Sequence, residues 1–305
     1  DRRGRHLHGE APVSGVSGNL RSIYAMLVAV VMFSLMDTAM KLLAAHYPSM
    51  QVASLRALSS LPLVCAYVAW RGGFSSMLQV RPSLHLLRGA LGIGMLAMFA
   101  YGLKQLSLAE AYSIFFIAPA LITAMSVFFL KETVNLARWI AIVVGLGGVL
   151  VVLRPQGTGM LTLGGLAILG SAVCYAISAI AARVQARTNS TRQMMFWLML
   201  LMAIGATALA APNWVALDPA HVWLLVGLAI SGFFGQLAIT EAFSHGEASV
   251  VAPFEYSALA WGVAIDWLLW QTLPDRYTML GAAIIIGSGI YLIRHERGHQ
   301  GTGHP

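Results

Sequence analysis

Charged residues and cysteines are both scarce in this sequence of 305 residues. Only 10% of the residues are charged, against about a quarter in a typical soluble domain. This shortage excludes a soluble enzyme and a soluble nucleic-acid-binding protein, although the net charge of +7 would suit the latter. The two cysteines, Cys65 and Cys174, lie inside apolar segments, so they predict neither a disulfide framework nor a metal site.

Motifs for cofactor chemistry are also missing from the sequence. It contains no phosphate-binding loop, no Gly-x-Ser-x-Gly turn and no dinucleotide fingerprint, so we expect no ATPase within this chain. Residues 295–299 read His-Glu-Arg-Gly-His, but this zinc-protease pattern works only on a helix, and we expect these residues in a tail after the last helix. The sequence therefore predicts no metal, no cofactor and no enzymatic activity.

Long apolar segments fill most of the chain, and 58% of its residues are hydrophobic. A bilayer core needs about 20 apolar residues for each spanning helix, and roughly ten such segments fit here. The sequence thus predicts an all-α integral membrane protein with ten transmembrane helices and short connections. The expected helices are 22–45, 50–71, 84–104, 109–131, 135–154, 162–186, 191–211, 220–242, 248–270 and 277–294.

The positions of Lys and Arg predict which side of the membrane each connection faces, because basic residues gather on the cytoplasmic side. With the N-terminus inside, fourteen basic residues fall on the inner side and four on the outer side. Both termini are therefore expected to be cytoplasmic. The inner residues are Arg2, Arg3, Arg5, Arg21, Arg71, Arg81, Arg88, Lys131, Arg138, Arg183, Arg187, Arg192, Arg294 and Arg297, and the outer ones are Lys41, Lys104, Arg154 and Arg276.

The two halves of the chain resemble each other. The segment LAEAYSIFFIAPAL at 108–121 corresponds to HGEASVVAPFEYSAL at 245–259. The pairs Ala141/Gly145 and Ala283/Gly287 place small residues one turn apart in the fifth and tenth helices, which favours close helix packing. The expected division is a polar cytoplasmic tail at 1–20, five-helix repeats at 21–155 and 156–295, and a cytoplasmic tail at 296–305.

A repeat unit of five helices has an odd number of crossings, so the second half is expected to be inverted relative to the first. Inverted repeats place a substrate site near the bilayer midplane and allow two facings of similar energy, which is the geometry of alternating access. An enzyme, or a signalling or scaffold protein, has no general need for this symmetry. The repeat therefore indicates a transporter.

The segment 108–132 and, more loosely, the segment 245–270 resemble the EamA branch of the drug/metabolite transporter superfamily. The resemblance extends over residues 22–294, and the chain is similar to bacterial aromatic amino acid exporters of the YddG type. The family pattern Leu-x-Glu after the fourth helix is matched by Leu130, Lys131 and Glu132, whereas the second half has Gln271 in place of the acid. The resemblance implies a central cavity lined by helices 1, 3, 4, 6, 8 and 9, with helices 5 and 10 outside it.

Charged residues inside the expected helices are costly in a bilayer, so each is a candidate functional residue. Asp37 and Lys41 lie four residues apart on the outer half of the first helix, and Arg56 lies at a similar depth on the second. These residues could form a charged outer gate or a binding point for a zwitterion. A purely structural ion pair is the alternative.

Glu255 lies near the middle of the ninth helix, with no basic residue close to it in sequence. Its carboxyl group could bind either a proton or the amino group of a substrate, and the alternative is an acid that hydrogen bonds to a neighbouring helix. Glu241 and Glu247 fall at the inner interface, where we expect them to be solvated.

Polar and aromatic residues at helical spacing predict the faces that line a cavity. Sparse hydrogen-bonding groups among aromatic walls suit a small amphiphilic molecule, although contacts between helices are the alternative for each residue. The candidates are Tyr112, Phe116 and Thr123 on the fourth helix, Tyr175 and Ser178 on the sixth, Gln236 on the eighth and Tyr256 on the ninth.

Pro119 and Pro253 interrupt corresponding helices in the two halves. A proline removes a backbone hydrogen bond and kinks a helix, so this pair predicts bending gates on the two sides of the site. Simple tolerance of proline in membrane helices is the alternative.

Together these features predict a secondary transporter of the bacterial inner membrane that exports small amphiphilic metabolites, with amino acids, aromatic ones included, as the expected substrates. Nucleosides or purines, S-adenosylmethionine and cationic drugs are alternative substrates. The expected partners are this small molecule and membrane lipids, and not nucleic acid. An intramembrane enzyme is the alternative class, but the sequence offers no convincing pair of nucleophile and base.

Overall fold

The computed structural model describes residues 14–153, 162–271 and 276–301. Within these ranges the chain folds into helices joined by short turns, and it contains no strand. The helices of the first half are α1 (Ser14–Ala44), α2 (Ser49–Trp70), α3 (Pro82–Leu103), α4 (Leu108–Phe115), α5 (Ile117–Phe129) and α6 (Leu136–Leu153). Those of the second half are α7 (Leu163–Gln185), α8 (Thr191–Ala210), η2 (Ala211–Asn213), η3 (Pro219–His221), α9 (Val222–His245), α10 (Ala248–Val251), η4 (Ala252–Ser257), α11 (Ala258–Trp270) and α12 (Arg276–Gly301).

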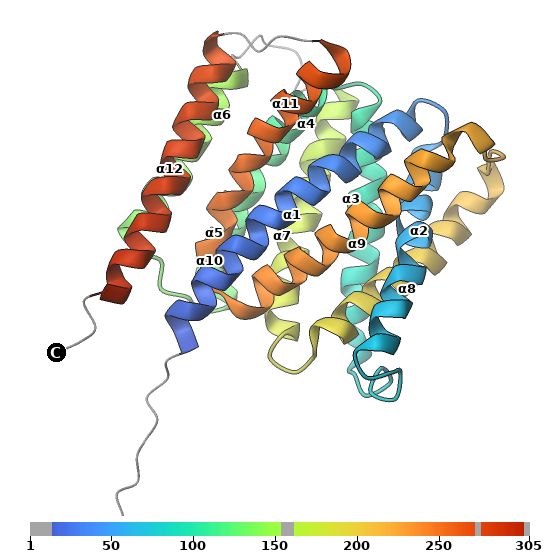
Figure 1. The fold of residues 1–305 in the computed structure, drawn as a ribbon, viewed down its shortest axis with the longest axis horizontal. Coiled ribbons are helices and arrows are strands. Elements are labelled where there is room, and N and C mark those ends of the chain that lie inside the picture. The colour runs from blue at the N-terminus through green and yellow to red at the C-terminus, as the bar shows by residue number, and fades with distance from the viewer. Residues whose placement is uncertain (1–13, 154–161, 272–275, 302–305) are drawn as a thin grey trace, which may run out of the picture.

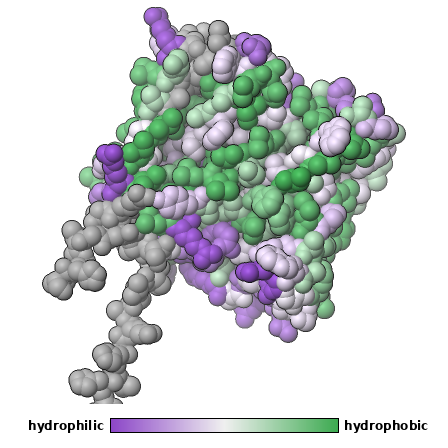
Figure 2. Space-filling view, viewed as in Figure 1, coloured by the Kyte–Doolittle hydropathy of each residue, from purple (hydrophilic) through white to green (hydrophobic). Residues whose placement is uncertain are grey.

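Seven helical stretches of the described chain are long and apolar enough to cross a membrane. Three shorter apolar helices, Ile117–Phe129, Leu136–Gly148 and Met279–His295, lie among them. Apolar side chains cover most of the face in Figure 2, and hydrophilic residues gather along its lower edge and at its upper rim. This distribution is typical of a multi-pass membrane protein. The count of ten spans and the orientation of the termini remain predictions.

Both ends of the helical region extend further than predicted. The first helix begins at Ser14 rather than at residue 22, and α12 continues to Gly301, into the segment predicted as a tail. Hydropathy marks only the part of a helix that enters the bilayer, so polar extensions of a helix escape it. The expectation that residues 295–299 follow the last helix was therefore wrong, since they lie on α12. Among the described residues, no three His, Cys, Asp or Glu side chains gather as a metal site would require.

Two of the predicted helices are interrupted near their middle. The predicted helix 109–131 is divided into α4 and α5 at Phe116, and the predicted helix 248–270 is divided into α10, η4 and α11. Proline has no N–H to donate to the carbonyl four residues earlier. Pro119 and Pro253 each remove one such bond beside an interruption.

The two prolines nevertheless occupy different positions relative to these interruptions. Pro119 is the third residue of α5, whereas Pro253 lies in η4, before α11 begins. The two prolines therefore lie on corresponding helices, as expected, but not at matching positions along them.

The helices pack in pairs that join the two halves of the chain. α1 packs along α9, α3 along α7, α2 along α8 and α6 along α12. In the second half, α7, α8, α9 and α12 are the counterparts of α1, α2, α3 and α6. Exchanging each helix for its counterpart converts the α1–α9 contact into the α3–α7 contact and leaves the α2–α8 and α6–α12 contacts unchanged. A two-fold axis produces this pattern. Figure 1 shows α6 and α12 side by side at one edge of the molecule.

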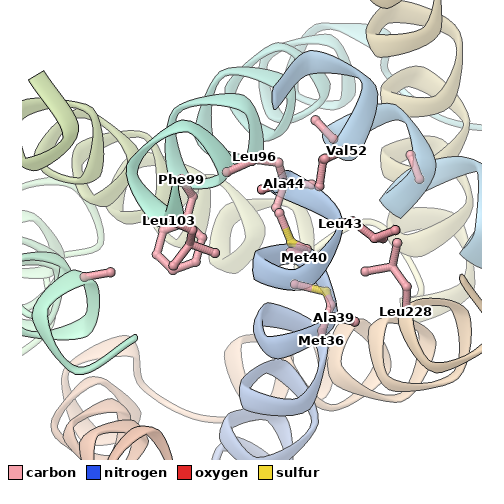
Figure 3. Packing of buried hydrophobic residues seen from close by; sticks show 14 of the residues in the cluster. Met36, Ala39, Met40, Leu43, Ala44, Val52, Leu96, Phe99, Leu103 and Leu228 are labelled. Atoms are coloured by element: carbon pink, nitrogen blue, oxygen red, sulfur yellow. The ribbon is translucent and has the colours of Figure 1, made fainter. Parts of the chain in front are cut away.

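The apolar core surrounds the second half of α1. Met36, Met40 and Leu43 repeat at the spacing of one helical face and are buried. Figure 3 shows this face of α1 between residues of α2, α3 and α9, among them Val52, Leu96, Phe99 and Leu228. This packing fixes α1, which carries the first charged residue of the site.

Candidate functional site

A cavity of about 170 Å³ lies between the helices of both halves. Residues of α1, α2, α3, α4, α7, α8, α9, η4 and α11 line it, and no described residue of α6 or α12 does. The lining therefore includes the six helices that the resemblance implied, and α2 and α8 in addition. Most of the wall is apolar, and its aromatic and methionine side chains include Phe33, Phe99, Phe115, Phe243, Met26, Met36, Met95, Met199 and Met202.

Aromatic rings form a continuous part of this wall. The ring of Phe115 lies 5.7 Å from that of Phe99 and 5.3 Å from that of Tyr175, and Tyr175 in turn lies 6.5 Å from Phe243. These centroid distances lie within the range of favourable aromatic contacts. The wall can therefore bind an apolar or aromatic group of a ligand.

One acid–tyrosine pair joins α1 to α4. The hydroxyl of Tyr112 donates to Asp37 Oδ2 at 2.7 Å, and the Asp37 side chain is buried. Arg56 of α2 also lines the cavity and interacts electrostatically with Asp37, but no ion pair within 4.0 Å joins these two described residues. This part of the cavity thus carries both signs of charge.

A second acid–tyrosine pair joins η4 to α7. The hydroxyl of Tyr175 donates to Glu255 Oε1 at 3.0 Å, and Glu255 is only 6% exposed. One turn along α7, the Ser178 hydroxyl accepts a long hydrogen bond of 3.4 Å from Arg88 Nε. Arg88 also donates to Gln185 Oε1 at 3.1 Å. The wall of the cavity therefore holds a second carboxyl group and a second arginine.

The two acid–tyrosine pairs join corresponding helices in the two halves, but the acid and the tyrosine have exchanged helices. In the first pair the acid is on α1 and the tyrosine on the helix interrupted at Phe116. In the second pair the tyrosine is on α7, the counterpart of α1, and the acid is on the interrupted helix. Each half therefore contributes one carboxyl group to the cavity, held by a phenolic hydroxyl.

Seven of the ten residues predicted for the cavity line it: Asp37, Tyr112, Phe116, Tyr175, Ser178, Gln236 and Glu255. The structure thus brings them together, and their roles remain predictions.

Three others lie outside the lining. Lys41 Nζ donates to the carbonyls of Leu103 and Leu106 at the end of α3, so the expectation that Lys41 faces the cavity was wrong.

Thr123 and Tyr256 were also placed wrongly by the sequence analysis. Thr123 is fully buried in α5, away from the cavity lining. Tyr256 packs against Phe116, with ring centroids 5.3 Å apart, and a Cβ added to Gly145 of α6 would lie 2.5 Å from its ring. Tyr256 therefore fills the contact between η4 and α6. Helical spacing could not separate these positions, because Tyr256 lies in an interruption and Thr123 lies beyond one, where the regular spacing of a continuous helix no longer holds.

Arg88 is a cavity residue that was not predicted from the sequence. It was counted among the inner cytoplasmic charges, yet it is 5% exposed, lies in α3 and lines the cavity. Its position inside the helix, six residues after Pro82, was the available signal. Arg138 and Arg183, counted in the same way, are also held by protein groups rather than by solvent.

These two arginines belong to a polar network at the start of α10. Glu132 accepts the N–H groups of Ala248 and Ser249 at 3.0 and 3.1 Å, and Arg183 lies 4.0 Å from it. Arg138 pairs with Glu247 and donates to the Ser249 hydroxyl at 3.1 Å. The acid of the Leu-x-Glu pattern thus ties the end of the fourth predicted helix to the start of the ninth.

Glu241 belongs to a neighbouring group of partners. It pairs with Arg21 at 2.8 Å and accepts from the Thr191 hydroxyl at 2.6 Å. Together with the Arg138–Glu247 pair, this corrects the expectation that Glu241 and Glu247 are simply solvated. Both acids join segments that are far apart in the sequence.

The model of the EamA-like transporter family matches residues 20–154 and again residues 162–294. The chain belongs to this family. Two matches in one chain correspond to the two halves seen in the helix pairing, and the protein is accordingly a multi-pass membrane transporter.

Characterised relatives in the family are similar over nearly their whole length. The pseudopaline exporter CntI of Pseudomonas aeruginosa (strain UCBPP-PA14) is 26% identical over 87% of this chain and 93% of its own. The S-adenosylmethionine uptake transporter of Rickettsia prowazekii is 27% identical, covering 93% and 96%. The riboflavin transporter of Vibrio cholerae is 26% identical, covering 89% and 92%. These relatives carry different small metabolites, and the first two are named for opposite directions.

A solved crystal structure supports the same fold. It aligns with 93% of this chain and 99% of its own chain at a TM-score of 0.75, with 19% sequence identity. At this identity the likeness concerns the fold alone.

Proposed function

We propose that this protein is a secondary transporter of the bacterial inner membrane that exports small zwitterionic metabolites, and that amino acids, aromatic ones included, are its substrates. The observation that carries the proposal is the combination of carboxyl and guanidinium groups in one cavity with an aromatic wall. An amino acid presents a carboxylate, an ammonium group and an apolar side chain, and each of these finds a complementary group here.

The electrostatics of the cavity support a zwitterion over a simple cation or anion. Asp37 and Glu255 contribute two acids, and Arg56 and Arg88 two permanently basic groups. Burying a charge in a low-dielectric site is costly unless an opposite charge compensates it. A zwitterion adds no net charge, so its entry leaves this balance unchanged, whereas a lone cation or anion alters it.

Within this proposal Glu255 binds the substrate amino group or a proton. It is buried, it lines the cavity, and it accepts a hydrogen bond from the Tyr175 hydroxyl. A carboxyl group in this position can release a proton when a substrate ammonium arrives, which is the minimal requirement for exchange.

The twofold arrangement supports an inverted repeat and alternating access between two facings. The interruptions beside Pro119 and Pro253 are the proposed bending points of the gates. Since α6 and α12 lie outside the cavity, they are the proposed static part against which the other helices move.

S-adenosylmethionine is the second candidate substrate, because a relative of similar sequence is named for its uptake. It carries an amino acid group, an additional positive charge and an aromatic base. Two acids and an aromatic wall would also suit it. Transport of labelled compounds into proteoliposomes separates the two candidates.

The test is uptake of a labelled panel containing phenylalanine, leucine, S-adenosylmethionine, adenosine and riboflavin, with and without a pH gradient. The proposal expects saturable uptake of the amino acids, with phenylalanine among them. Uptake of S-adenosylmethionine or adenosine without any amino acid would overturn it.

A further inference from the structure

Arg56 is a cationic side chain enclosed in the protein beside the cavity. It lies two turns into α2, is 2% exposed, and is among the largest fully buried side chains. A buried charge persists only where hydrogen bonds and an opposite charge compensate it. The hydrogen-bond partners of its guanidinium show what compensation the protein itself supplies.

Only part of the guanidinium is satisfied by the protein. Nη1 donates to the Ser60 hydroxyl at 3.0 Å and contacts Met199 Sδ at 3.5 Å, and Nη2 donates to the Gly232 carbonyl at 3.1 Å. Nε is buried and has no partner among the described residues. An arginine has five N–H donors, so donors remain for a further acceptor, and none of the present partners is a carboxylate.

From this geometry we propose that Arg56 binds the carboxylate of the transported molecule and so selects carboxylate-containing substrates. The planar guanidinium matches a carboxylate through two parallel hydrogen bonds. Asp37 interacts electrostatically with Arg56 but accepts its hydrogen bond from Tyr112. It therefore leaves Nε of Arg56 available. A substrate carboxylate bound at Nε would satisfy this buried donor and pair the charge.

Arg88 does not offer the same opportunity. Its Nε and Nη1 already donate to Ser178 and Gln185. None of its described donor atoms is both buried and without a partner. Arg56 is therefore the specificity-determining arginine of the two.

The position of the guanidinium depends on a glycine of α9. A Cβ added to Gly232 would lie 2.9 Å from Arg56 Cζ and 3.0 Å from Nη1. Gly232→Ala therefore displaces the guanidinium while its charge remains. Gly227 lies on the same helix and would place a Cβ in open space, so Gly227→Ala is the matched control.

The test measures binding by the purified full-length protein as the rise in melting temperature that a compound causes. Matched pairs are compared, phenylalanine with phenylalaninamide and 3-phenylpropionate with 3-phenylpropionamide. The parent and Gly227→Ala are expected to prefer each acid over its amide. Arg56→Lys, which keeps the charge but loses the fork, and Gly232→Ala are expected to bind the acids about tenfold more weakly or worse, with amide binding unchanged.

The inference is overturned if the parent does not distinguish the acids from the amides, or if both Arg56→Lys and Gly232→Ala keep the parent's preference. It rests on the proposed function only for the identity of the substrate. Arg56-dependent binding of the acids without any amino acid uptake would uphold the inference and overturn the proposed substrate class.

Discussion

At the scale of the residue, the site depends on two carboxyl groups that each accept a hydrogen bond from a tyrosine. Sequence reasoning could find Asp37, Tyr112, Tyr175 and Glu255, because each is a polar or amphipathic residue in an apolar segment. It could not find the pairs, since their members stand 75 and 80 positions apart. Nor could it separate Lys41, which binds carbonyls of the chain, from the cavity residues.

Replacing Glu255 with Gln tests the proposed role of this acid. Gln keeps the shape and can still accept the hydrogen bond from Tyr175, but it can neither bind a proton nor pair with an ammonium group. We expect the variant to fold with the parent's melting temperature, to bind amino acids about tenfold more weakly or worse, and to lose the pH dependence of uptake. The measurement is uptake into proteoliposomes from mildly acidic to neutral pH. Parent-like affinity and pH dependence would leave Glu255 a structural residue.

At the scale of the element, most helices lie within a few residues of their predicted ranges, because long apolar segments are a strong signal. The interruptions were predicted from proline, but their form was not. A 3-10 segment of six residues precedes α11, whereas α4 and α5 are separated at one residue. Tertiary packing decides between these forms, as the contact of Tyr256 with α6 illustrates.

The interrupted helices make a prediction about gating. Pro119→Ala and Pro253→Ala each restore a backbone donor and thus favour a straighter helix. Both variants are expected to slow transport several-fold while yield and melting temperature stay close to those of the parent. Pro62→Ala in α2 is the control, since this proline has no counterpart in the other half. Should both variants transport at the parent's rate, the interruptions do not act as gates.

The contact between α6 and α12 makes a second prediction at this scale. A Cβ on Gly148 would lie 2.8 Å from Ile285 Cγ1 and 2.9 Å from the Gly281 carbonyl, whereas one on Gly147 would meet nothing within 4 Å. Overpacking of such a contact costs about 1–3 kcal/mol. Gly148→Ala is thus expected to lower the melting temperature, and Gly147→Ala to leave it unchanged or raise it. Equal melting temperatures for the two variants would contradict the close approach.

At the scale of the whole molecule, the internal repeat was visible in the sequence, but which helices pair across the two halves was not. The outer position of α6 and α12 followed from the family resemblance. The small-residue pairs predicted to favour close packing do so at Gly145, which approaches the ring of Tyr256, but not at Gly287. A Cβ on Gly287 would meet nothing within 4 Å, and Gly148 provides the close approach instead. A small-residue pattern shows where helices can approach, and the rotation of each helix decides where they do.

The orientation of the protein is a prediction at this scale. A reporter fused to the C-terminal end of the chain is expected to be cytoplasmic, and one inserted between residues 212 and 219 external, because basic residues gather inside. Two reporters on the same side of the membrane would refute the ten-span arrangement.

Counterflow through the cavity tests the central claim most directly. Proteoliposomes loaded with unlabelled phenylalanine should accumulate labelled phenylalanine transiently above its equilibrium level. Ala179 of α7 lines the cavity and Ile177 is exposed on the same helix, so Ala179→Trp should abolish this overshoot and Ile177→Trp should preserve it. No overshoot with the parent protein, or an undiminished one with Ala179→Trp, would contradict transport of amino acids through this cavity.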